Sequence, residues 1–97
     1  MVNQMKRIKL NEYNASLGTL IDIEDQYTYS KKHHKDSINI PYQKLIYNYK
    51  TLLDKNKPYF IVCNGGFKSK KLVNILEFYG YNVTQVYNEW FFSDFDL

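Results

Sequence analysis

Residues 59–69 read YFIVCNGGFKS, and this stretch decides the fold. The four residues before Cys63 are aromatic or β-branched, a composition typical of a strand that is covered on both faces. The strand runs directly into Cys63 and two glycines, and apolar residues then recur at intervals of three and four from Ser69 to Tyr79. That spacing predicts a helix, so a strand passes through a short glycine loop into a helix.

The same alternation of strands and helices extends in both directions, with Gly18, Pro41 and Gly80 marking boundaries. We expect five strands, at Arg7–Leu10, Leu20–Ile23, Ser37–Ile40, Tyr59–Val62 and Asn82–Tyr87. We expect helices capped by Asn11 and ending at Leu17, and at Gln26–Lys32, Tyr42–Leu53 and Ser69–Tyr79. Asp25 is the expected cap of the second helix. The pattern predicts one α/β domain over residues 1–97, a small, mostly parallel five-stranded sheet with helices on both faces.

The composition excludes several classes of protein. The 97 residues are 44% hydrophobic with a formal net charge of +3, and their longest apolar run is too short to span a membrane. Twelve of the 13 basic residues are Lys and are spread along the chain, so we expect no nucleic-acid partner. No apolar stretch follows the basic N-terminus, so no secretory signal is visible and we expect a cytoplasmic protein.

Cys63 is the one cysteine of the chain and the candidate reactive group. It can form no intramolecular disulfide, and the adjacent His33 and His34 point apart, so we expect no metal site. Gly65 and Gly66 allow successive backbone N–H groups to point inward as an anion-binding nest, and the following helix adds its own N–H groups and its dipole. Such surroundings favour the thiolate, which is the reactive form of cysteine.

Three lysines follow the glycines of this loop. Lys68, Lys70 and Lys71 lie in or beside the first turn of the predicted helix, where positive charge is unfavourable without an anion. Lys68 is the best candidate for substrate contact, while Lys70 and Lys71 are candidates for steering anions over a longer range. A solvated lysine-rich surface is the alternative interpretation. Phe67 and Asn64 are expected at the mouth of the loop, where they influence which molecule can approach.

Taken together, these segments resemble a single rhodanese domain, the fold of the thiosulfate sulfurtransferases and their sulfur-carrier relatives. The resemblance covers about Leu20 to Tyr87 and rests on LIDIEDQYTYSKKHH, SINIPY, YFIVCNGGFKS and FYGYNV in that order. It implies that Cys63 is the nucleophile and carries a persulfide. It also implies a substrate-binding loop formed by Asn64, Gly65, Gly66, Phe67, Lys68 and Ser69. The same resemblance implies that the donor is a small anionic sulfur compound such as thiosulfate and that the acceptor is a thiol or a protein. It also implies that no cofactor is needed.

The chain departs from the usual rhodanese pattern at three places. Glu24 stands where the family usually has Arg, and the glycines around the turn at His33 are replaced. Asn88 and Glu89 stand where two glycines usually turn the chain. An aromatic tail follows, with Trp90, Phe91, Phe92 and Phe95. We expect these side chains to pack on the sheet edge rather than to dock a partner.

Two alternatives to sulfur transfer stay open. A phosphatase would need a loop one residue longer that ends in Arg, whereas Lys68 and Ser69 stand fifth and sixth after Cys63 and offer no bidentate clamp for phosphate. A non-catalytic binding or regulatory module would keep the fold without the chemistry, which the departure at Glu24 favours and the Cys63 loop opposes. Sulfur transfer is the interpretation that we prefer.

Overall fold

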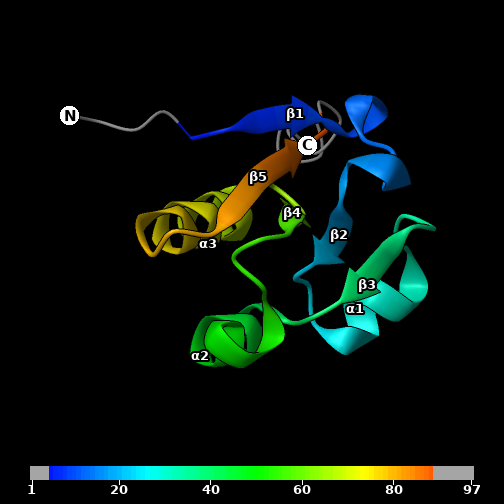
Figure 1. Ribbon diagram of the computed structural model, residues 1–97. Coiled ribbons are helices and arrows are strands. Elements are labelled where there is room, and N and C mark those ends of the chain that lie inside the picture. Colours follow the sequence, from blue (N-terminus) through cyan, green and yellow to red (C-terminus); the bar gives the residue numbers. More distant parts are fainter. Residues whose placement is uncertain (1–4, 89–97) are drawn as a thin grey trace.

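The computed structural model describes residues 5–88, in which five strands form one sheet (Figure 1). The strands are β1 (Arg7–Lys9), β2 (Thr19–Asp22), β3 (Ser37–Asn39), β4 (Pro58–Val62) and β5 (Asn82–Tyr87). Their order in the sheet is β1-β5-β4-β2-β3, and every neighbouring pair is parallel. The predicted α/β class and parallel five-stranded sheet are therefore confirmed.

Strand β4 lies at the centre of the sheet, between β2 and β5. Its last residue, Val62, pairs with Asp22 of β2 and with Val86 of β5. The next residue, Cys63, therefore leaves the middle of the sheet at its carboxyl edge, which is where parallel sheets bind ligands.

The described residues form three α-helices, α1 (Gln26–Lys31), α2 (Tyr42–Leu52) and α3 (Phe67–Phe78). As predicted, Asp25 caps α1, because its side chain accepts the backbone N–H of Thr28. The prediction of a helix that is capped by Asn11 and ends at Leu17 is wrong. That segment forms two 3₁₀ turns, η1 (Leu10–Glu12) and η2 (Ala15–Leu17). The side chain of Asn14 accepts the N–H of Ser16 and so interrupts a continuous α-helical ladder.

Two apolar clusters lie on the two sides of the sheet. Alternation along β4 puts Ile61 on one side and Phe60 on the other. The first cluster joins the sheet to α2 and α3 through residues that include Leu45, Leu53, Leu72, Val73 and Leu76. The second is closed by Tyr13, whose ring lies 5.3 Å from that of Phe60 and 5.8 Å from that of His34, between centroids. The sheet is thus packed against apolar side chains on both sides.

Some predictions fall outside residues 5–88. Glu89 and the aromatic tail, with Trp90, Phe91, Phe92 and Phe95, are not among the described residues. Within the described part of the chain, no helix has the length and apolar character needed to cross a bilayer.

Candidate active site

Cys63 is a free thiol directly after β4, with 2% of its surface exposed. Gly65 and Gly66 follow with φ angles of 76° and 81°, a left-handed conformation that favours glycine. The two glycines turn the chain so sharply that α3 begins at Phe67, two residues earlier than Ser69, where the sequence predicted its start. Three residues of the predicted binding loop, Asn64, Gly65 and Gly66, therefore precede the helix, and the other three belong to its first turn.

The backbone N–H of Ser69 donates a hydrogen bond to Cys63 Sγ over 3.2 Å. Ser69 is in the first turn of α3, whose N–H groups have no acceptor within the helix. The helix therefore directs toward the sulfur an N–H group that has no partner within the helix, together with the positive end of the helix dipole. This arrangement stabilises negative charge on Cys63 or on a sulfur atom attached to it.

Gln85 of β5 contacts both the loop and the start of α3, and only 3% of its surface is exposed. Its Nε2 donates to the carbonyl oxygen of Gly66 over 2.9 Å and to Ser69 Oγ over 3.0 Å. Ser69 Oγ in turn donates to the Gly66 carbonyl over 3.2 Å. The residue that contacts Cys63 and the glycine that starts the helix are thus tied to one buried amide.

Arg7 of β1 sets the orientation of this amide. Its Nε donates to Gln85 Oε1 over 3.0 Å. A guanidinium can only donate and a carbonyl can only accept, so one orientation of the Gln85 amide satisfies both Arg7 and Gly66. Neither Arg7 nor Gln85 was predicted from the sequence to belong to the site. The available signals were a long polar residue inside a covered strand and the one arginine of the chain.

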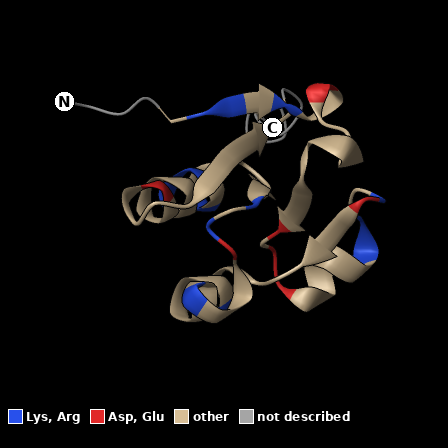
Figure 2. Ribbon diagram, in the orientation of Figure 1, with Lys and Arg blue, Asp and Glu red and all other residues tan. Residues whose placement is uncertain are grey.

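Glu24 contacts the other side of the loop, where its Oε2 accepts the backbone N–H of Asn64 over 2.8 Å. The Glu24 backbone is itself held. Its N–H donates to Asp22 Oδ1 over 2.9 Å, and its carbonyl accepts Asn39 Nδ2 over 2.8 Å. Figure 2 shows acidic residues gathered between the end of β2 and the start of α1. Glu24, one of the departures noted in the sequence, therefore makes direct contact with the Cys63 loop.

Asp22 is the buried member of this acidic group, with 8% of its surface exposed. Burial raises the pKa of its carboxyl, and the nearby charge of Glu24 raises the pKa further. The hydrogen bond from the Glu24 N–H and the proximity of His33 lower the same pKa and only partly offset the rise. These surroundings therefore favour the neutral form of the Asp22 carboxyl.

The side chains predicted at the mouth of the loop are exposed to solvent. Asn64, Phe67 and Lys68 are exposed, and Phe67 has 77% of its surface accessible. Lys70 and Lys71 follow along α3 and are also exposed, and Figure 2 shows basic residues on this helix. Gly65, Gly66 and Ser69 are buried. The predicted site residues thus divide into a buried group, which includes Cys63, and an exposed group on the loop and the first turns of α3.

The two histidines have contacts of their own at the end of α1. The ring of His33 stacks on Tyr29, with centroids 3.7 Å apart. His34 Nδ1 accepts the N–H of Asp36 over 3.1 Å. Residues 5–88 contain no group of three or more His, Cys, Asp or Glu side chains that could hold a metal ion. Both histidines therefore support the turn that leads into β3.

A family model described as a rhodanese-like domain matches residues 3–91. Among curated proteins, no match is found. Solved structures are similar over most of the chain. A rhodanese-related protein from Thermoplasma volcanium is 26% identical with a TM-score of 0.76, and the match covers 92% of each chain.

Two further solved structures support the same likeness. A rhodanese-like domain protein from Staphylococcus aureus is 27% identical with a TM-score of 0.76, covering 87% of this chain and 86% of that one. A structure described as rhodanese with anions, from E. coli, is 28% identical with a TM-score of 0.61, covering 72% of this chain and 84% of that one.

Proposed function

This chain belongs to the rhodanese-like domain family, and on that premise we propose that it is a sulfurtransferase that works through a persulfide on Cys63. The donor is thiosulfate or a persulfide, and the acceptor is a thiophilic small molecule or protein. The observation that carries the proposal is the hydrogen bond from the N–H of Ser69, at the start of α3, to Cys63 Sγ. It directs a fixed donor at the one sulfur atom that could act.

In the first half-reaction the Cys63 thiolate attacks the outer sulfur of the donor. A bond forms between Sγ and that sulfur while the S–S bond of the donor breaks, and with thiosulfate the electron pair leaves on sulfite. The new outer sulfur carries the negative charge. Fixed N–H donors stabilise such a charge because they need no reorganisation, and in other enzymes one donor contributes about 2.7–4 kcal/mol.

In the second half-reaction an acceptor nucleophile attacks the outer sulfur of the persulfide. The bond to Sγ breaks and returns the Cys63 thiolate, so the two substrates bind in turn and the kinetics are ping-pong. No cofactor enters either step. The exposed lysines near the start of α3 are suited to attract an anionic donor. A cytoplasmic location stays a prediction.

A non-catalytic binding module is the second candidate function. Two observations favour it: only 2% of the Cys63 surface is exposed, and Glu24 accepts one of the loop N–H groups. A phosphatase is less well supported, because Glu24 adds negative charge to the loop and Lys68 cannot clamp phosphate as Arg does.

The test is mass spectrometry of the intact protein after incubation with thiosulfate or a persulfide donor. We expect a gain of one sulfur atom in the native chain, followed by its loss when cyanide or a thiol is added. Cys63→Ser should gain none while keeping the native urea-unfolding midpoint. A native chain that gains no sulfur from any donor would favour the binding module. Hydrolysis of an aryl phosphate would favour the phosphatase.

A further inference from the structure

Glu24 places a carboxylate at the loop that is expected to receive the sulfur donor. Its Oε2 lies 2.8 Å from the backbone nitrogen of Asn64, the residue that directly follows Cys63. This N–H group would otherwise be free to contact an incoming anion. That hydrogen bond holds the carboxylate at the loop, and the Glu24 backbone is itself hydrogen-bonded to Asp22 and Asn39.

A fixed carboxylate at this position acts differently on donors of different charge. Thiosulfate carries two negative charges. If the separation is taken as about 6 Å in water-like surroundings, Coulomb repulsion by one carboxylate weakens donor binding about threefold for each negative charge that the donor carries. Lys68, Lys70 and Lys71 are exposed on α3 and attract anions to the surface, whereas Glu24 touches the loop itself.

We propose that Glu24 is a specificity-determining residue, which makes this chain disfavour small dianionic donors such as thiosulfate relative to donors that carry less negative charge. The proposal rests on the sulfur transfer proposed above, and it narrows the donor class. A physiological donor would be a monoanionic or neutral sulfane compound, or a persulfide carried on a protein.

The test compares two donors that deliver the same sulfane sulfur. Thiosulfate is a dianion, and an arenethiosulfonate, RSO2S⁻, is a monoanion. In both cases the Cys63 thiolate takes the outer sulfur, the S–S bond of the donor breaks, and the electron pair leaves on sulfite or on the sulfinate RSO2⁻ respectively. The measurement is the second-order rate constant for sulfur uptake by Cys63 with each donor at low ionic strength.

The variant Glu24→Gln removes the charge and keeps an amide oxygen that can accept the Asn64 N–H. We expect it to raise the rate constant about tenfold for thiosulfate and about threefold for the thiosulfonate, so that the ratio of the two rises about threefold. At about 1 M salt, where the Debye length is about 3 Å, the ratios of the variant and the native chain should converge.

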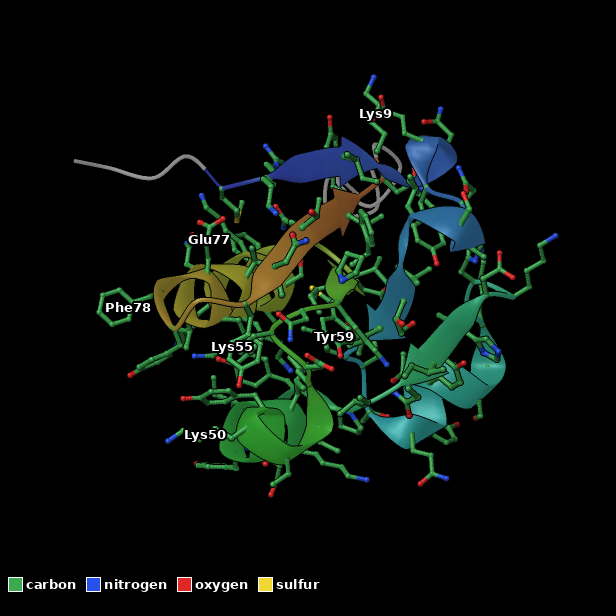
Figure 3. All side chains as sticks on the ribbon, in the orientation of Figure 1. Lys9, Lys50, Lys55, Tyr59, Glu77 and Phe78 are labelled. Atoms are coloured by element: carbon green, nitrogen blue, oxygen red, sulfur yellow. The ribbon has the colours of Figure 1, made fainter. Side chains whose placement is uncertain are left out.

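Two further variants serve as controls. Glu77→Gln makes the same change in net charge near the far end of α3 (Figure 3) and should leave the donor ratio unchanged. Glu24→Ala removes both the charge and the hydrogen bond. It should raise the ratio as Glu24→Gln does, and a lower rate with both donors would separate the role of the hydrogen bond from that of the charge.

The possible failures are distinguishable. If sulfur is taken up but Glu24→Gln leaves the donor ratio within a factor of about 1.5 of the native value, the specificity proposal is wrong and sulfur transfer stands. If neither the native chain nor Glu24→Gln takes up sulfur from either donor, both proposals are wrong. If Glu77→Gln changes the ratio as much as Glu24→Gln, net charge and not the carboxylate at the loop is responsible.

Discussion

At the scale of single residues, two neighbouring carboxylates beside the Cys63 loop have different surroundings. Asp22 is buried and accepts the backbone N–H of Glu24, whereas Glu24 is half-buried and reaches the loop. Burial raises the pKa of the Asp22 carboxyl. The folded protein therefore retains a proton on Asp22 over a pH range in which the unfolded chain has already lost it.

This difference gives Asp22 a predictable effect on stability. The stabilising contribution of the protonated form is complete below the unfolded pKa of about 3.9 and is lost as the pH rises through the higher folded pKa. Asp22→Asn stays neutral and keeps an oxygen that can accept the Glu24 N–H. We therefore expect the free energy of unfolding of Asp22→Asn, relative to the native chain, to increase between pH 4 and pH 7.

Urea unfolding at several pH values measures this effect. Asp36→Asn removes an equal charge from an exposed position and serves as the control. If the free energies of unfolding of Asp22→Asn and the native chain change in parallel over this pH range, Asp22 does not have the proposed effect on stability.

At the scale of secondary-structure elements, one buried amide joins a strand edge to the start of a helix. Gln85 of β5 contacts Gly66 and Ser69 at the beginning of α3 and Arg7 of β1. The left-handed Gly66 starts the helix, and Gln85 holds its carbonyl in place. The direction of the Ser69 N–H toward Cys63 therefore depends on contacts among three elements.

Replacement of Gln85 by Leu tests this linkage, because Leu has a similar size and no polar atoms. It removes two donated hydrogen bonds and leaves Arg7 Nε without its acceptor, so we expect a loss of about 1–3 kcal/mol in the free energy of unfolding. Sulfur uptake by Cys63 should also slow under conditions in which the variant is fully folded. Thr84→Val, on the opposite face of the same strand, is the matched control for both measurements. An unchanged uptake rate in folded Gln85→Leu would show that the amide supports stability alone.

At the scale of the whole molecule, the chain that leaves the central strand β4 carries a buried thiol and, soon after it, an exposed aromatic ring. Cys63 is 2% exposed and Phe67, four residues later, is 77% exposed. The same helix carries Phe78 at its other end, where it is 81% exposed and projects from the protein (Figure 3). Phe67 therefore presents an exposed ring at the start of the helix that follows the Cys63 loop.

We expect Phe67→Ala to change the relative rates with which different acceptors remove sulfur from Cys63, with a smaller effect on persulfide formation. The physical reason is that a large acceptor covers exposed apolar surface on docking, whereas a small donor does not. Phe78→Ala removes an equally large exposed ring from the far end of α3 and should alter neither step. The measurement is the rate of each half-reaction with a small thiol and with a protein thiol. A larger effect on persulfide formation than on acceptor preference would count against this role for Phe67.

The α/β class, the parallel sheet and the place of Cys63 could all be predicted because they depend on local patterns. Alternating strand and helix periods follow from neighbouring residues, as does the glycine pair after β4. The start of α3 at Phe67 was missed because it depends on the left-handed conformation of Gly66. The two 3₁₀ turns near Asn14 were also missed, because the balance between helix types in a short segment is too small to read from composition.

The contacts around the sulfur could not be read from the sequence, because their partners lie far apart along the chain. Gln85 and Gly66 are 19 residues apart, Glu24 and Asn64 are 40 apart, and Arg7 and Gln85 are 78 apart. The sequence by itself determined which residue could react and which elements surround it. Only the tertiary structure decided which backbone N–H faces the sulfur, which amide holds it, and which carboxylate borders the loop. Hydrogen bonds act over about 3 Å in space, and only the packing of β1, β2, β5 and α3 brings these groups within that distance.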